Sequence, residues 1–132
     1  APGTYYFSNI TVDGTLNADT TGGTVTIYFN GVINTGNACA INNLSKMPSS
    51  LLFFGEQNSN THVLACPAPL HAYLEERSGI WSLYGPLYGR VWGGNVTVFG
   101  SGSVHANAGP NQSSPARVTW EKTTWAQRYK RQ

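Results

Sequence analysis

Cationic and aromatic side chains are interleaved at the C-terminal end of this 132-residue chain, and no other segment is better suited to binding chemistry. The residues concerned are Arg117, Trp120, Lys122, Trp125, Arg128, Tyr129, Lys130 and Arg131. Cations attract phosphates and flat rings stack on bases or sugars, so the segment is a candidate for binding DNA without reading its base sequence. In an alternative interpretation, Trp120 and Trp125 cap an open end of the fold and leave only the charges for a ligand.

The distribution of charge supports a basic C-terminal segment. The net charge is only +2, and charged residues make up 11% of the chain. No Lys or Arg precedes Lys46, whereas five of the eight basic residues follow position 116, where only Glu121 opposes them. A weak overall charge therefore conceals a local excess of positive charge.

A second candidate surface lies around position 90. Alternate side chains of an extended strand point to the same face, which places Tyr88, Arg90 and Trp92 together. An arginine is rarely buried without a partner, so we expect this face to be exposed to solvent. Its rings would hold a surface glycan or DNA by stacking.

The sequence lacks the patterns that enzymes and metal sites require. It contains no nucleophile elbow and no phosphate-binding loop. His62, His71 and His105 do not have the spacing of metal ligands, so we expect no metal and no cofactor. Glu75 and Glu76 are adjacent and would face opposite ways on a strand, whereas a glycosidase needs two carboxylates in one cleft. These features predict a binding module and not an enzyme.

The two cysteines, Cys39 and Cys66, indicate an oxidising compartment. A single pair in a small, polar chain favours a disulfide, with two buried thiols as the alternative. No run of 18 residues is apolar enough to cross a membrane, and no leader peptide is recognisable. The chain opens on Ala1-Pro2-Gly3-Thr4, and we interpret it as a mature form or an excised domain.

The elements that must position these residues are short strands joined by turns rich in Gly and Asn. Between Thr24 and Phe29, polar and apolar side chains alternate, and the turn signal Asn30-Gly31 follows. Residues 70–76 are the one stretch that tolerates a helix. Similar phrases return about every 20 residues, which favours stacked coils. The sequence therefore predicts an all-β, single-domain β-solenoid, with a β-sandwich of about seven strands as the alternative.

Several phrases resemble one known domain. They are Gly3-Thr4-Tyr5-Tyr6-Phe7, Ile10-Thr11-Val12-Asp13-Gly14-Thr15-Leu16 and the segments 23–31, 36–43, 83–89 and 96–105. Together they resemble the solenoid-like domain near the C-terminus of PilX-type minor pilins of type IV pili. One similar type is the competence-associated pilin of thermophilic bacteria, which is linked to DNA capture. The resemblance covers residues 3–105, but residues 67–77 fit it poorly, so we expect an insertion in place of one coil there.

The resemblance implies a scaffold and a location outside the cell, on or near the pilus. Residues 1–105 would form the solenoid module, and residues 106–132 would form a Gly/Asn/Ser linker and the basic-aromatic segment, which packs on the solenoid in the capping interpretation. DNA is the leading partner, and a surface glycan is the alternative ligand of a pilus-tip adhesin. A third interpretation is a purely structural domain that contacts other pilins.

Overall fold

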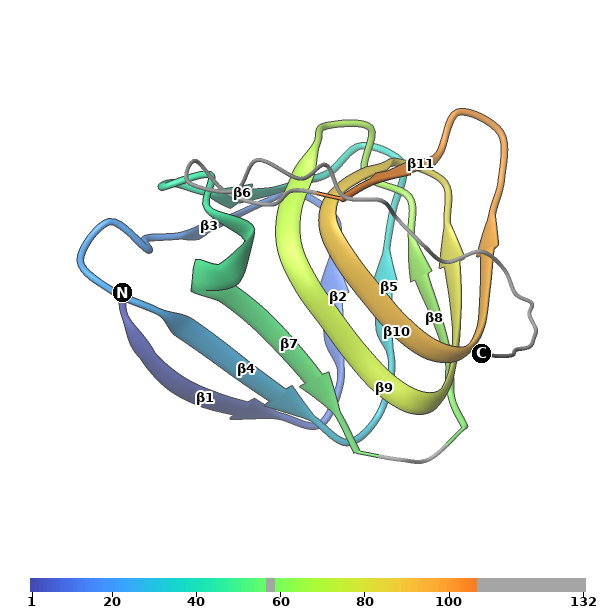
Figure 1. Ribbon diagram of the computed structural model, residues 1–132, viewed down its shortest axis with the longest axis horizontal. Helices are drawn as coiled ribbons and strands as arrows, with labels where there is room; N and C mark the ends of the chain where they lie inside the picture. The colour runs from blue at the N-terminus through green and yellow to red at the C-terminus, as the bar shows by residue number, and fades with distance from the viewer. Residues whose placement is uncertain (57–58, 107–132) are drawn as a thin grey trace.

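The computed structural model describes residues 1–56 and 59–106, which wind into a parallel β-solenoid of about five turns (Figure 1). The prediction of an all-β solenoid is confirmed. Every described strand pairing is parallel, which excludes the antiparallel β-sandwich. The elements are β1 (Gly3–Phe7), β2 (Ile10–Val12), β3 (Thr15–Ala18), β4 (Val25–Phe29), β5 (Ile33–Thr35), β6 (Ala40–Asn43), a 3₁₀ turn η1 (Pro48–Ser50), β7 (Leu51–Gly55), β8 (Thr61–Leu64), β9 (Leu70–Leu83), β10 (Pro86–Val98) and β11 (Ser103–His105).

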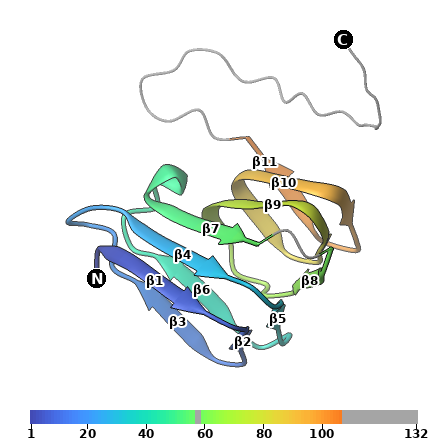
Figure 2. The ribbon, with the colours of Figure 1, turned by 90° about the horizontal axis from the view of Figure 1, so that it is seen from below.

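Each coil has three sides, and equivalent strands of successive coils lie side by side (Figure 2). The first side contains β1, β4 and β7, followed by the middle of β9 and of β10. The second side contains β2, β5 and β8, followed by the final parts of β9 and β10. The third side contains β3 and β6, followed by the start of β9, the start of β10, and β11. The strands are short on the first two coils because turns rich in Gly and Asn form the corners.

The core is a stack of inward-facing rows. On β4 the predicted alternation is confirmed, because Val25, Ile27 and Phe29 are buried while Tyr28 faces outward. The parallel register repeats each position in the next coil, so that Ile27 pairs with Phe53, and Phe53 with Leu74. Positions that pair in successive coils form a row and share the same environment. Each row is therefore apolar or polar along much of its length.

The two cysteines connect neighbouring coils. Cys39 precedes β6 and Cys66 follows β8, and their sulfur atoms form a disulfide with the Cα atoms 4.9 Å apart. This separation is close to the spacing of adjacent parallel strands, so the coil stacking brings the pair within bonding distance. The predicted disulfide is confirmed.

The expectations for residues 67–77 are wrong. Residues 70–76 are not helical but form the first half of β9, in which Leu70, Ala72, Leu74 and Glu76 point inward. This segment does not replace a coil, because β9 pairs with β7 and β8 on one edge and with β10 on the other. The polar sequence concealed the strand because one of its inward positions holds a glutamate.

Candidate ligand-binding face

The first side of the solenoid carries an outward row of aromatic residues. Tyr6, Tyr28 and Phe54 occupy the same position in successive coils, and their rings stack with centroids 5.3 and 5.5 Å apart. Because these rings cover one another, they present mainly their edges to solvent. Tyr6 begins the row, is 75% exposed, and has one ring face that no described ring covers.

The row changes character in the last two coils. The next position is Glu75 on β9, and the one after it is Trp92 on β10. Glu75 interrupts the stack of rings, so Trp92 has no ring–ring contact among the described residues. Instead, the Arg77 guanidinium lies over the indole, 4.4 Å from its centroid, and Trp92 remains 53% exposed. A cation therefore lies over the indole, and about half of the Trp92 surface remains exposed to solvent.

A second cation lies beside the indole. Arg90 is paired in register with Tyr73 of β9, and its guanidinium lies 4.2 Å from the centre of the tyrosine ring. Arg90 and Trp92 are two residues apart on β10, and both point outward, as the alternation predicts. We call Tyr73, Glu75, Arg77, Arg90 and Trp92 the Trp92 cluster.

Tyr88 lies apart from this cluster. It precedes Gly89, which has a φ of 143° and pairs with Ala72. The Tyr88 ring stacks between His71 and His105, with centroids 5.0 and 4.4 Å away, so both of its faces are covered. The structure thus brings together Arg90 and Trp92 from the predicted surface and adds Tyr73, Glu75 and Arg77. It places Tyr88 on the third side of the solenoid, between His71 and His105. Those additions depend on the register between coils, which no local pattern in the sequence reveals.

The C-terminal candidates Arg117, Trp120, Lys122, Trp125, Arg128, Tyr129, Lys130 and Arg131 lie outside the described residues. Because five of the eight Lys and Arg residues lie in this segment, residues 1–106 have a different net charge from the whole chain. Residues 1–106 contain the acidic Asp13, Asp19, Glu56, Glu75 and Glu76, but only Lys46, Arg77 and Arg90 as cations. The solenoid coils are therefore slightly acidic, and the net charge of +2 comes from the residues after position 106.

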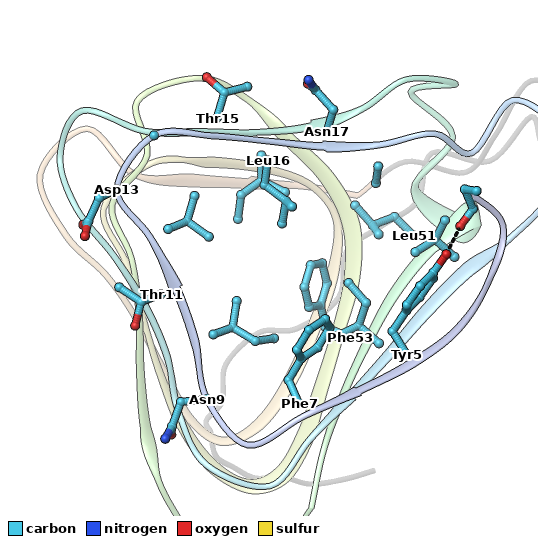
Figure 3. Close-up of a pocket in the computed structure, with 18 residues that line it drawn as sticks. Tyr5, Phe7, Asn9, Thr11, Asp13, Thr15, Leu16, Asn17, Leu51 and Phe53 are labelled. Atoms are coloured by element: carbon cyan, nitrogen blue, oxygen red, sulfur yellow. Dashed lines mark hydrogen bonds between the residues drawn. The ribbon is translucent and has the colours of Figure 1, made fainter.

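The N-terminal end of the solenoid contains an apolar cavity of about 550 Å³ (Figure 3). It is the interior of the first coil, which has no further described coil above it. Phe7 and Leu16 point into the opening, Thr11, Asp13 and other polar side chains point away from it, and the Tyr5 hydroxyl donates to the Ala1 carbonyl at one corner. The described residues that line the cavity are mainly apolar, so the cavity offers hydrophobic contact.

A buried histidine and glutamate form a separate polar pair in the core. His62 on β8 and Glu76 on β9 are almost fully inaccessible, and His62 Nε2 lies 2.7 Å from Glu76 Oε1. The Ile33 backbone N–H donates to His62 Nδ1, so the proton of the neutral ring is on Nε2 and is donated to Glu76. Burial lowers the pKa of His62, and the neighbouring carboxylate opposes that shift only in part.

Two glycines leave space for this pair and for the Trp81 ring that packs against it. Gly55 lies next to Glu76 in the same inward row, and a Cβ at Gly55 would lie 2.3 Å from Glu76 Oε1. Gly93 follows in that row, and a Cβ there would meet the Trp81 ring at 2.4 Å. The tilted contact between His62 and Trp81, with centroids 4.4 Å apart, completes the packing. The pair was not predicted from the sequence, which contains no signal that aligns positions 62 and 76.

Two features are absent from the residues that the structure describes. No three His, Cys, Asp or Glu side chains among them are grouped so that they would hold a metal ion. None of their elements is a helix long and apolar enough to cross a membrane.

Comparisons with protein-family models, with curated proteins and with solved structures find no significant match to this chain.

Proposed function

We propose that this chain is a non-enzymatic recognition module that binds a glycan at the Trp92 cluster. The observation that carries the proposal is the indole of Trp92, which is half-exposed and held in place by the guanidinium of Arg77. Carbohydrates present apolar C–H faces that pack on flat aromatic rings, and a ring with little freedom to move loses little entropy on binding.

The polar members of the Trp92 cluster suit the hydroxyl groups of a sugar. Arg77 and Arg90 are exposed donors, and Glu75 supplies carboxylate oxygens as acceptors. The slightly acidic coils are a poorer partner for a nucleic acid, since DNA binding depends on neutralising several phosphates. A glycan therefore fits the described surface better than DNA does.

The test is a glycan array probed with the intact chain and with W92A. We expect the wild type to bind a subset of glycans and the variant to lose binding at least about tenfold. Y6A is the matched control, because it removes an exposed aromatic side chain at the other end of the same row. Equal binding by W92A and wild type, with folding verified by circular dichroism, would contradict the proposal.

DNA binding through the C-terminal segment is the second candidate function. It is favoured by the segregation of charge, because five of the eight Lys and Arg residues follow position 116. The full-length triple variant R128Q/K130Q/R131Q should bind DNA more weakly and with a shallower salt dependence, by about one unit of slope for each lost phosphate contact. The control is K46Q, which removes a cation from the coils. Unchanged DNA affinity in the triple variant would exclude these three residues from binding.

The biological setting rests on the resemblance to PilX-type minor pilins. We place the module outside the cell, as part of a type IV pilus, in contact with other pilins. The confirmed disulfide is compatible with such an oxidising location. Immunogold labelling of the pilus, or co-purification with the other minor pilins, tests this placement separately from ligand binding.

A further inference from the structure

We propose that the glycan bound at the Trp92 cluster carries a carboxylate and that Arg90 binds this carboxylate. The inference rests on the proposed glycan-binding function and specifies its ligand class. It follows from the different surroundings of the two arginines in the cluster.

Arg77 already has an acidic partner, whereas Arg90 has none among the described residues. Arg77 Nε donates to Glu75 Oε2 at 3.4 Å. The other ion pair in the described part of the chain is the buried pair of His62 and Glu76. The charge of Arg90 is therefore not neutralised by a carboxylate of the coils, although the coils as a whole are acidic.

Tyr73 orients the guanidinium of Arg90 for such a contact. The central carbon of the guanidinium lies 4.2 Å from the centre of the ring, and this contact restrains the Arg90 side chain. A planar fork of N–H donors matches the two oxygens of a carboxylate, and a guanidinium that is already held loses less freedom when it binds.

The spacing of Arg90 and Trp92 fits one acidic sugar unit. Residues two apart on the same side of a strand are separated by about 6.6 Å. A pyranose ring stacked on the indole would therefore present its exocyclic carboxylate toward the neighbouring guanidinium. Among the described residues, β11 pairs with β10 only as far as Tyr88. Beyond Tyr88, β10 pairs only with β9, so no described strand lies along the other edge of β10 beside Arg90 and Trp92.

The position of Glu75 favours a sugar acid over a nucleic acid. Glu75 precedes Trp92 in the same outward row and is only partly neutralised by Arg77. It would repel the closely spaced phosphates of DNA or RNA, whereas a single carboxylate bound at Arg90 meets a cation that has no acidic partner among the described residues. The chemistry of the cluster is therefore that of a uronate-containing glycan.

The experiment compares two tetrasaccharides that differ only in charge, tetragalacturonate and its full methyl ester, by calorimetric titration of the intact chain at low salt. We expect the acid to bind about tenfold more tightly than the ester, in line with a charge-assisted hydrogen bond. R90Q should remove this preference, so that the acid and the ester bind the variant with equal affinity. K46Q, which removes a different exposed cation, should preserve the preference.

The outcomes separate this inference from the function on which it rests. Equal affinity for acid and ester, or a preference that survives in R90Q, overturns the role of Arg90 and leaves glycan binding intact. Binding of neither tetrasaccharide also overturns the inference, and the array with W92A then decides independently whether the module binds glycans. A preference that disappears equally in R90Q and K46Q reports general charge attraction and likewise overturns the assignment.

Discussion

At the scale of single residues, the buried pair of His62 and Glu76 makes stability depend on pH. In the folded chain the histidine is neutral, and burial keeps its pKa below the ordinary value of 6.5. In the unfolded chain the histidine binds a proton near pH 6.5, so the contribution of His62 to stability is fully present above that pH. It falls as the pH drops from 6.5 toward the lowered folded pKa, by up to about 1.4 kcal/mol per pH unit. Urea unfolding at pH 7.5, 6.0 and 5.0 measures the slope.

A control variant isolates the contribution of His62. His71 also has a lowered pKa, caused by partial burial and by Lys46, and it would add to the slope in the same direction. H71N removes that contribution and should retain most of the pH dependence, because His62 is far more deeply buried. Stability that is independent of pH between 5 and 7.5 in H71N would refute the assignment.

The sequence allowed only part of this residue-scale chemistry to be predicted. The outward positions of Arg90 and Trp92 follow from simple alternation along one strand. The contacts of Arg77 with Trp92 and of His62 with Glu76 join different coils, so they depend on a register that local patterns do not contain. Likewise, the interruption of the aromatic row by Glu75 can be recognised only when the strands of neighbouring coils are aligned.

At the scale of elements, the bend of β10 depends on Gly89. Its φ of 143° is unfavourable for other residues, and a Cβ would lie 2.0 Å from the Ala72 carbonyl oxygen of β9. We expect G89A to lower the free energy of unfolding by at least about 2 kcal/mol, because both backbone strain and a backbone clash oppose it. The matched control is G14A, since a Cβ at Gly14 has no neighbour within 4 Å. Similar stability of the two variants, measured by urea unfolding, would contradict this account.

The long strands β9 and β10 also show where element prediction succeeds and fails. The alternation in residues 24–29 was sufficient to predict β4 and its buried face, because one side of that strand is consistently apolar. Residues 70–76 follow the same alternation, but Glu76 occupies an inward position and disguises it. Its burial is tolerated because Gly55 leaves space and His62 supplies a hydrogen bond, and neither compensation lies nearby in the sequence.

At the scale of the whole molecule, the disulfide joins the early coils to the later ones. Cys39 and Cys66 are 27 residues apart, and closing a loop of that size in the unfolded chain contributes about 3.5 kcal/mol in the chain-entropy description. We expect the double variant C39A/C66A to lose approximately this much stability in urea unfolding. The wild type in excess reductant should show a comparable loss, which controls for the missing sulfur atoms. A loss below about 1 kcal/mol would show that the stacking of coils already restrains this loop.

The same bridge sets how the solenoid would respond to a mechanical load. A solenoid pulled by its two ends unwinds coil by coil, because each coil contacts only its neighbours. The 27-residue segment between the cysteines cannot extend while the disulfide is intact. The applied force therefore cannot extend about 90 Å of contour length, and the chain becomes a shorter, stiffer tether. Opening the bridge would release that length in one step, which turns a covalent bond between coils into a switch for extensibility.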